Sequence, residues 1–285
     1  MPDKNYCLIT GASRGFGKAL ALECASRKMN LVLVSLPGPE LFYLAEHIKH
    51  HYQVDVITIE KDLVPEENCI MVYKQVKELG LHVNMLINNA GLGSTMLFSE
   101  GSMDFFEKQI NLNVLVATRL THLFLDDLKT NRPSHILNVG SLGSYFFLEK
   151  KQVYGATKSF IYSFSKSLRR ELKEDGINVS VICPGSMNTN ATITQLQKTS
   201  GWLSRQSVMA PEEVALIAIN GLLNRKEVII PGRLNKLFLL VDKLLPSFIS
   251  KAITRRQMKN IASVTASEMN QEAILLNEKQ NSLIG

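Results

Sequence analysis

The chain contains little cysteine and no long apolar run. Its four cysteines, Cys7, Cys24, Cys69 and Cys183, are scattered over 285 residues without a CxxC pair. This spacing excludes a disulfide framework and favours a reducing compartment. No stretch approaches the roughly 18 consecutive apolar residues that a membrane span requires. Residues 6–13 already predict a strand and a turn instead of a signal peptide, so we expect a cytoplasmic protein.

Positive charge is scarce outside one segment. The chain carries a net charge of +6, and residues 233–260 hold seven basic residues against one acid, Asp242. These are Arg233, Lys236, Lys243, Lys251, Arg255, Arg256 and Lys259. The rest of the chain is therefore neutral overall, which argues against nucleic acid as a partner.

Three histidines have a spacing that a metal site would use. His47, His50 and His51 share one face of a predicted helix. No nearby carboxylate, cysteine or fourth histidine completes a ligand set. We therefore expect a solvated helix end and no metal.

Short apolar segments alternate with longer periodic ones along most of the chain. Strands are predicted at 6–10, 31–35, 55–60, 85–88, 135–140, 178–183 and 228–230. Helices are predicted at 15–27, 40–51, 66–80, 103–128, 152–174 and 211–223. Continuously apolar strands are typical of a sheet covered on both faces. The alternation predicts an α/β fold: a single, doubly wound parallel sheet in a domain spanning 1–232.

A glycine-rich turn directly follows the first predicted strand. TGASRGFGKAL, residues 10–20, places Gly11, Gly15 and Gly17 where the backbone must turn tightly before a helix. The N-terminus of that helix presents free N–H groups and a positive dipole end, which suit a pyrophosphate. The context of strand, glycine turn and helix favours a dinucleotide site over simple helix capping.

Three motifs occur together in a fixed order. They are TGxxxGxG at 10–17, Asn88-Asn89-Ala90-Gly91, and Tyr154 with Lys158 four positions later. Residues 5–232 thereby resemble the short-chain dehydrogenase/reductase family, whose fold is Rossmann-type. The resemblance implies a catalytic tetrad of Asn113, Ser141, Tyr154 and Lys158. It also implies cofactor contacts by Gly11, Ser13, Arg14, Gly15, Phe16, Gly17, Ser35, Asp62, Asn89, Ala90, Gly91, Tyr154, Lys158, Pro184, Gly185 and Thr189.

The end of the second strand indicates which nicotinamide cofactor is used. NAD-type sites usually carry an acid there, but this strand ends in Ser35 and Leu36. Arg14 supplies a cation where NADP-preferring relatives often keep one, although their frequent arginine at position 36 is missing. We expect NADP(H) to be preferred, with NAD(H) as the alternative.

The pair Tyr154 and Lys158 shares one helix face, because residues four apart on a helix are neighbours. A free phenol has a pKa near 10. A cation within about 4–6 Å favours the phenolate, so we expect Lys158 to lower the pKa of Tyr154. Tyr154 would then exchange a proton with a ketone oxygen that Ser141 holds, while the nicotinamide carries the hydride. The alternative is that Tyr154 and Lys158 lie on the surface of a helix and have no catalytic function.

The resemblance adds further roles. Lys158 would also hold the nicotinamide ribose, Asn113 would support a chain of waters, and Thr189 would hold the carboxamide. The segment after the sixth strand would form a lid, in which Met187 and Trp202 either line an apolar pocket or pack the lid. Members of the family are commonly homodimers or homotetramers.

Residues 233–285 form an extension beyond the family's domain. Apolar residues recur there with a helical period, Pro246 interrupts them, and cations accompany them. This segment predicts peripheral membrane contact through 233–260, or packing on the domain or a sister subunit. Membrane contact would imply an apolar carbonyl or alcohol substrate, such as a keto-lipid (3-ketosphinganine) or a steroid. A 3-oxoacyl thioester reductase and a non-catalytic NADP-binding regulator are the alternatives.

Overall fold

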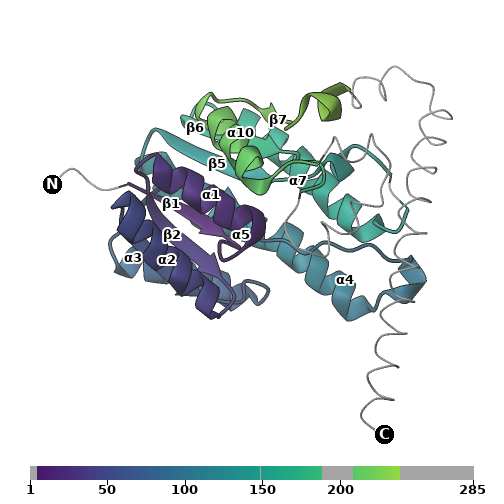
Figure 1. Ribbon diagram of the computed structural model, residues 1–285, viewed down its shortest axis with the longest axis horizontal. Coiled ribbons are helices and arrows are strands. Elements are labelled where there is room, and N and C mark those ends of the chain that lie inside the picture. The colour runs from purple at the N-terminus through teal and green to yellow at the C-terminus, as the bar shows by residue number, and fades with distance from the viewer. Residues whose placement is uncertain (1–4, 148, 188–207, 238–285) are drawn as a thin grey trace, which may run out of the picture.

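The structure, a computed structural model, describes residues 5–147, 149–187 and 208–237 (Figure 1). In this part of the chain, seven parallel strands form one sheet in the order β3-β2-β1-β4-β5-β6-β7. The strands are β1 Asn5–Thr10, β2 Asn30–Ser35, β3 Val56–Glu60, β4 His82–Asn88, β5 Ser134–Val139, β6 Ile177–Ile182 and β7 Val228–Ile229. The predicted doubly wound parallel sheet is confirmed.

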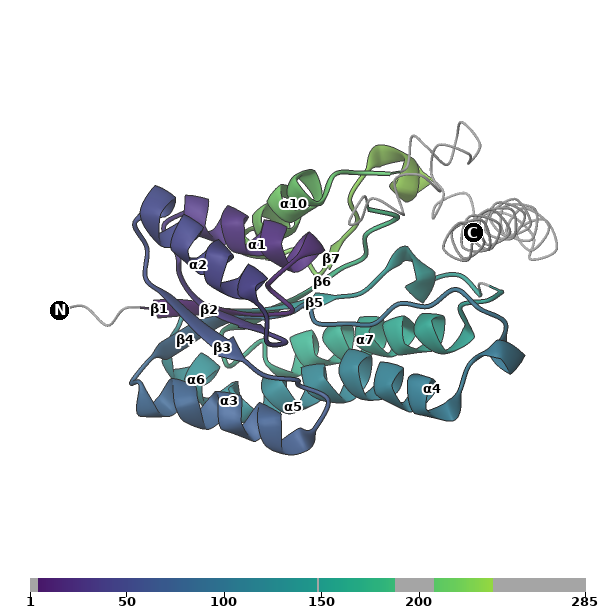
Figure 2. The same ribbon diagram turned by 60° about the horizontal axis from the view of Figure 1, so that its bottom comes forward.

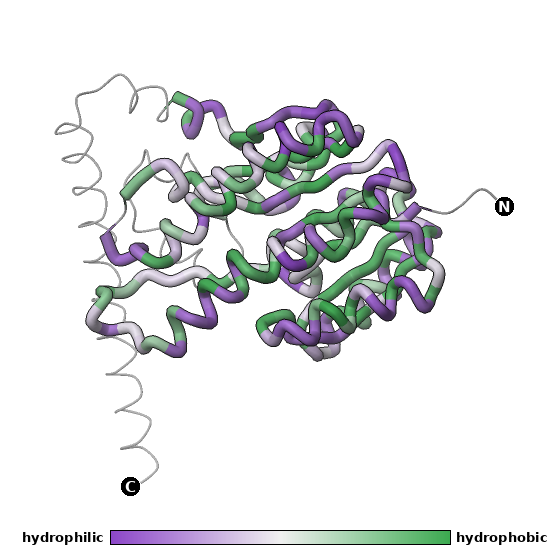
Figure 3. The backbone as a smooth tube through the Cα atoms, turned by 180° about the vertical axis from the view of Figure 1, so that it is seen from behind, coloured by the Kyte–Doolittle hydropathy of each residue, from purple (hydrophilic) through white to green (hydrophobic). Residues whose placement is uncertain are grey.

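Helices cover both faces of the sheet (Figure 2). One face is covered by α1 Gly15–Ser26, α2 Pro39–Tyr52 and α10 Pro211–Leu223. The other is covered by α3 Glu66–Glu78, α5 Val116–Leu123, α6 Leu125–Thr130 and α7 Gln152–Glu171, with α4 Met103–Ile110 beyond the strand ends. Each face has its own apolar core. Burial on both faces explains why most positions of the central strands are apolar, and green, apolar segments predominate in the interior of the tube in Figure 3.

Helix α10 begins as its sequence predicts. Pro211 lies in the first turn, where its missing N–H costs nothing, and Glu212 and Glu213 follow at the positive end of the helix. The helix packs against α1 and completes the core on that face.

The helix predicted over 103–128 is not continuous. After α4, residues Asn111–Leu115 form a π-helical turn (η2), and the chain breaks again at Phe124 between α5 and α6. Phe124 is fully buried and its ring meets that of Tyr73 edge-on, with the centroids 5.1 Å apart. Periodicity alone predicted one helix because the apolar pattern persists through both breaks.

The order of strands reverses between β1 and β4. In open parallel sheets, a ligand binds outside the carboxyl ends of the strands at such a reversal. The fold therefore directs attention to the segments after Thr10 and Asn88.

The described residues end five residues into the extension. Residues 233–237 begin a helix, and everything from 238 onward lies outside the described residues. The predicted extension and its domain boundary therefore stay predictions. Within the described ranges, no helix has both the length and the apolar character to cross a membrane.

Candidate active site

The glycine turn lies at the carboxyl end of β1. Gly11 and Gly15 have φ values of 65° and 56°, a region that side chains rarely adopt. A Cβ on Gly17 would lie 2.0 Å from the carbonyl oxygen of Gly11. The turn can be this tight only because glycine occupies these positions, and it leaves the N-terminus of α1 open to a ligand.

Thr10 joins this turn to the segment after β4. Its Oγ1 accepts hydrogen bonds from the backbone N–H groups of Asn89 and Ala90, both at 3.0 Å. The Asn89 amide returns two bonds, to the carbonyl oxygens of Thr10 at 2.8 Å and Gly11 at 3.2 Å. Thr10 was missing from the predicted site, although its place before the glycine turn was a usable signal.

The remaining residues of the turn differ in exposure. Arg14 is exposed at the N-cap of α1, and in the described part of the chain its guanidinium has no salt-bridge partner. Ser13 is half-buried, whereas the Phe16 ring is buried in the core beneath the turn. Among these three, only Arg14 offers a charge to a ligand.

Ser35 is the last residue of β2, and Asp62 follows the neighbouring strand β3 by two residues. The buried Ser35 hydroxyl donates to the carbonyl oxygen of Leu36 at 2.9 Å, so its hydrogen is already used. Asp62 Oδ1 accepts from the N–H of Val64 at 3.1 Å, which shapes the turn into α3. Asp62 keeps its second carboxylate oxygen for another partner.

Tyr154 and Ser141 meet beyond the end of β5. Ser141 Oγ accepts from the N–H of Gly143 at 3.0 Å, and its hydroxyl is near enough to Tyr154 to lower the pKa of the phenol. Lys158 is buried, and its Nζ lies 5.9 Å from the centroid of the Tyr154 ring. That ammonium donates to the carbonyl oxygen of Val139 at 2.7 Å. The structure thus brings together the three residues of the predicted proton-transfer group.

The expected direction of the pKa shift of Tyr154 is wrong for this site. Burial raises the pKa of the Tyr154 phenol above 10, and the neighbouring Ser141 hydroxyl offsets only part of that rise. Lys158 is not among the causes of the shift. Burial lowers the pKa of Lys158 itself to about 8. Desolvation is therefore the largest cause of both shifts.

Asn113 links the loop after β4 to α7. Its Oδ1 accepts from the N–H of Leu92 at 2.7 Å, and its Nδ2 donates to Leu92 O and to Thr157 Oγ1, each at 3.0 Å. Thr157 donates in turn to the carbonyl oxygen of Tyr154 at 2.7 Å. The π-helical turn places the amide here. The part of Thr157 in this network was not predicted, because no motif in the sequence indicates it.

Gly91 lies where these groups converge. A Cβ there would lie 3.1 Å from Asn113 Oδ1 and 3.5 Å from Lys158 Nζ. A side chain at this position would crowd the Asn113 amide and approach the Lys158 ammonium. Glycine at position 91 therefore leaves space between these two groups.

The segment after β6 closes the remaining side. Pro184 O accepts from the N–H of Leu142 at 2.9 Å. A Cβ on Gly185 would lie 3.0 Å from the buried amide of Asn235. Met187 pairs with Met209 in an isolated parallel bridge. Thr189 and Trp202, both predicted from the family's pattern, lie outside the described residues.

The sequence model of the family described as short chain dehydrogenase matches residues 5–200. The chain belongs to the short-chain dehydrogenase family. It is therefore an oxidoreductase that acts on CH–OH groups with a nicotinamide cofactor, and the predicted fold and enzyme class are confirmed.

Three known members show how far the similarity extends. The chain is 31% identical over 191 residues to 17-beta-hydroxysteroid dehydrogenase type 3 of Mus musculus, covering 66% of this chain and 61% of that one. It is 30% identical over 187 residues to very-long-chain 3-oxoacyl-CoA reductase of Macaca fascicularis, covering 63% and 58%. A short-chain dehydrogenase from Sphingobium yanoikuyae, solved with NADPH, matches with a TM-score of 0.74 and 27% identity, covering 86% and 95%.

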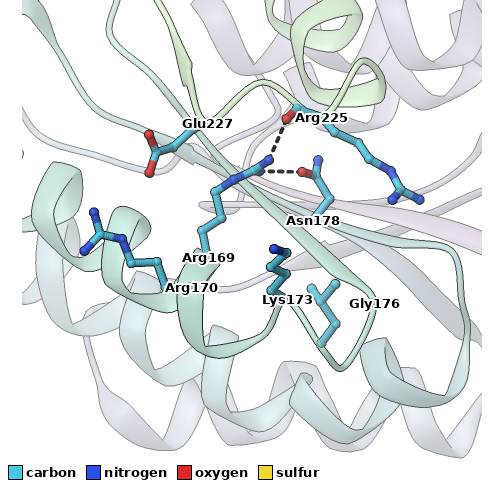
Figure 4. Close-up of a pocket in the computed structure, with 8 residues that line it drawn as sticks. Arg169, Arg170, Lys173, Gly176, Asn178, Arg225 and Glu227 are labelled. Atoms are coloured by element: carbon cyan, nitrogen blue, oxygen red, sulfur yellow. Dashed lines mark hydrogen bonds between the residues drawn. The ribbon is translucent and has the colours of Figure 1, made fainter.

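This short-chain dehydrogenase also has a basic pocket of about 390 Å³ at the amino end of β6 (Figure 4). Arg169, Arg170, Lys173 and Arg225 line it. The guanidinium of Arg169 donates to Asn178 Oδ1 and to the carbonyl oxygen of Arg225, both at 2.6 Å. Because Tyr154 lies at the opposite end of the strands, this pocket is not part of the candidate active site.

Proposed function

We propose that the protein is an NADP(H)-dependent oxidoreductase that interconverts a ketone and a secondary alcohol, with Tyr154 as the general acid and base. One observation carries this proposal: Ser141, Tyr154 and Lys158 lie together beyond the end of β5, with the Lys158 ammonium 5.9 Å from the centroid of the Tyr154 ring. This group lies beside the glycine turn, where the strand order reverses.

In the reductive direction, Tyr154 donates its proton to the ketone oxygen. Ser141 donates a second hydrogen bond to the same oxygen and stabilises the charge that develops there. The bound nicotinamide supplies the hydride. Lys158, charged below about pH 8, stabilises the phenolate that remains on Tyr154. Because burial raises the pKa of Tyr154, the phenol is a weaker acid than free tyrosine. The reaction therefore needs Lys158 to stabilise the phenolate.

In this mechanism Asn113 positions other residues and does not itself contact the substrate. Its amide fixes both the loop at Leu92 and, through Thr157, the helix that carries Tyr154 and Lys158. The chain of waters through Asn113 that the family's pattern implies stays a prediction, as does the contact of Thr189 with the carboxamide.

Three features support NADP(H) over NAD(H). The second strand ends in Ser35 and Leu36, so the strand does not carry the acid that NAD-type sites usually have at this position. The exposed guanidinium of Arg14 stands at the same edge of the sheet. The Sphingobium relative was solved with NADPH. NAD(H) would fit the same glycine turn with lower affinity.

The substrate that we propose is an apolar ketone or its alcohol. Leu97, Phe98, Met103 and Phe147 are exposed apolar residues on the segments that follow β4 and β5. These segments leave the strands at their carboxyl ends, beside Tyr154. Relatives named for a hydroxysteroid and for very-long-chain 3-oxoacyl-CoA favour a steroid or a long acyl chain, including the thioester alternative.

One test separates catalysis from mere cofactor binding. NADPH absorbance is followed with a panel of steroid and acyl ketones, for the wild type and for Tyr154→Phe. We expect the variant to lose about a hundredfold to ten-thousandfold in rate, the usual contribution of a general acid, while NADPH binding is retained. Equal rates on an accepted ketone would contradict the mechanism. NADPH binding without turnover of any ketone would favour the regulator.

Residues 233–260 support a second part of the proposal. Their cations and periodic apolar residues would place this homodimeric or homotetrameric enzyme at an anionic membrane surface. Sedimentation with vesicles checks this: binding to anionic vesicles at low salt, lost at high salt and absent with neutral vesicles, is expected. Failure to bind anionic vesicles at low salt would remove the membrane from the proposal.

A further inference from the structure

A second lysine lies beside the tyrosine. Lys151 immediately precedes α7, and its Nζ lies 5.4 Å from the centroid of the Tyr154 ring. It donates to the carbonyl oxygen of Ser94 at 3.4 Å. Tyr154 therefore has one cation a helical turn before it and another, Lys158, a turn after it.

The two lysines lie at different depths. Helix α7 returns the chain from the end of β5 to the start of β6, so it runs antiparallel to the strands. Lys158 bonds to Val139, the last residue of β5. Lys151 lies seven residues earlier, about 10 Å farther out along the helix axis at 1.5 Å per residue. It therefore faces Tyr154 from the outer side of the site, beyond the strand ends.

The ammonium of Lys151 is largely removed from water, yet it makes few hydrogen bonds within the protein. It has three N–H donors, and in the described part of the chain it has one long hydrogen bond and no carboxylate partner. Burial lowers the pKa of Lys151 below its usual value, which shows that the charged form loses hydration. A cation that is partly buried without a counter-ion costs free energy, which an anionic ligand would recover.

Neighbouring groups fix and complement this ammonium. Ser94 Oγ accepts from Gln109 Nε2 at 3.1 Å, and among the described residues its own hydrogen has no acceptor. Lys150 has a φ of 63°, a conformation rare for a side-chain residue, and its carbonyl oxygen accepts from the N–H of Met96 at 2.9 Å. Such backbone strain persists where the surroundings impose it. The contact joins the segment before α7 to the segment that contains Ser94.

We propose that Lys151 and Ser94 form a subsite for a carboxylate of the substrate, so that the preferred ketone carries an acid group within a few bonds of its carbonyl. This inference rests on the proposed function, because Tyr154 must meet the ketone oxygen. The Lys151 ammonium and the hydroxyl of Ser94, the residue whose carbonyl oxygen it contacts, are both donors, and they suit a carboxylate, whose oxygens only accept. A long-chain 3-oxo acid combines this group with an apolar tail. An aminoketone such as 3-ketosphinganine would bring a like charge toward Lys151 and is disfavoured.

Calorimetry on the NADP⁺-loaded enzyme tests the subsite with two matched probes, 3-hydroxydecanoate and its uncharged methyl ester. The acid should bind the wild type about ten- to a hundredfold more tightly than the ester, the range expected for a hydrogen bond to a charged group. Lys151→Met should remove that preference without weakening the ester, and Lys151→Arg should keep most of it. Lys150→Met removes the same charge one residue away and should leave the preference intact.

Equal binding of acid and ester by the wild type, no binding of the acid, or an acid preference that survives in Lys151→Met would overturn the subsite. These results are distinct from failure of the proposed function. Turnover of a neutral ketone that depends on Tyr154, without any acid preference, would leave the reaction standing and remove only the carboxylate. Acid binding that depends on Lys151, with turnover insensitive to Tyr154→Phe, would support the subsite and remove the reaction mechanism.

Discussion

The two sides of Tyr154 are built in different ways. On the inner side, Thr10, Gly11, Asn89 and Ala90 are joined by four hydrogen bonds of 2.8–3.2 Å, each between a side-chain atom of Thr10 or Asn89 and a backbone atom. On the outer side, exposed side chains dominate, and Phe147 is 101% exposed. A network that depends on two specific side chains and on tight backbone turns tolerates little change in sequence, whereas exposed side chains can vary freely. We therefore expect the inner side to carry the chemistry common to the family and the outer side to determine the substrate.

The largest effect on the inner side is expected for Gly17→Ala. The added Cβ would lie 2.0 Å from Gly11 O, a contact with backbone that cannot swing away. The turn must open, so we expect NADPH binding to be lost and unfolding free energy to fall by about 1–3 kcal/mol or more. Urea unfolding and NADPH fluorescence measure the two effects.

Gly155→Ala is the matched control. A Cβ at Gly155 would lie 3.7 Å from Gly143 O, which is ordinary contact, and alanine is the better helix former. This variant should be as stable as the wild type or slightly more so. Should Gly17→Ala bind NADPH as well as Gly155→Ala does, the rigid picture of the inner side would be wrong.

The pKa of Lys158 predicts how activity and stability on the inner side depend on pH. Its folded pKa of about 8 lies below the usual 10.5. The charge that the reaction uses is present below about pH 8, so kcat/KM should fall above that pH, approaching tenfold per unit. Stability should move in the opposite direction, because above pH 8 the unfolded chain binds more protons than the folded one.

The change in stability with pH can be measured by comparing the wild type with one variant. Between pH 8 and 9, the unfolding free energy of the wild type should rise relative to that of Lys158→Met, in which this group is absent. A difference that stays flat or falls over this interval would show that Lys158 keeps its ordinary pKa when folded.

Much of this inner side was predictable. The apolar strands fixed the sheet, and the glycine spacing located the turn, because only a tight backbone path requires glycine at 11 and 17. Tyr154 and Lys158 were found because helical spacing brings them together. Each of these inferences follows from local geometry, which a sequence states directly.

The outer side was predicted much less well. The π-helical turn that places Asn113 leaves the apolar periodicity unbroken, and the left-handed conformation of Lys150 has no glycine to signal it. Lys151 was not among the predicted site residues, since only tertiary structure brings its ammonium to the carbonyl oxygen of Ser94. The direction of the Tyr154 pKa shift also failed, because desolvation depends on the surrounding atoms and not on the spacing of two residues.

Thr10→Val tests the network with a change of nearly constant shape. The valine removes the oxygen that accepts from Asn89 and Ala90 and leaves two N–H groups without that acceptor. We expect a loss of about 1–3 kcal/mol in unfolding free energy and weaker NADPH binding. Thr118→Val, whose hydroxyl among the described residues bonds only to Val114 O, one turn earlier in the π-helical turn, should change stability by less than about 0.5 kcal/mol. Equal losses of unfolding free energy in both variants would show that the Thr10 hydroxyl does not stabilise the contact between the glycine turn and the segment after β4.

The smallest effect is expected at the rim of the inner side, for Arg14→Gln. Arg14 is exposed, so water and salt screen its attraction for a 2′-phosphate, and an exposed charge pair contributes only about 0.2–1 kcal/mol. The KM for NADPH should rise about two- to fivefold while the KM for NADH stays unchanged, and added salt should narrow the difference. Lys18→Gln, an exposed cation one turn farther along α1, should affect neither cofactor. If NADPH and NADH respond equally to Arg14→Gln, the guanidinium contacts a part common to both, and the preference must come from Ser35 and Leu36.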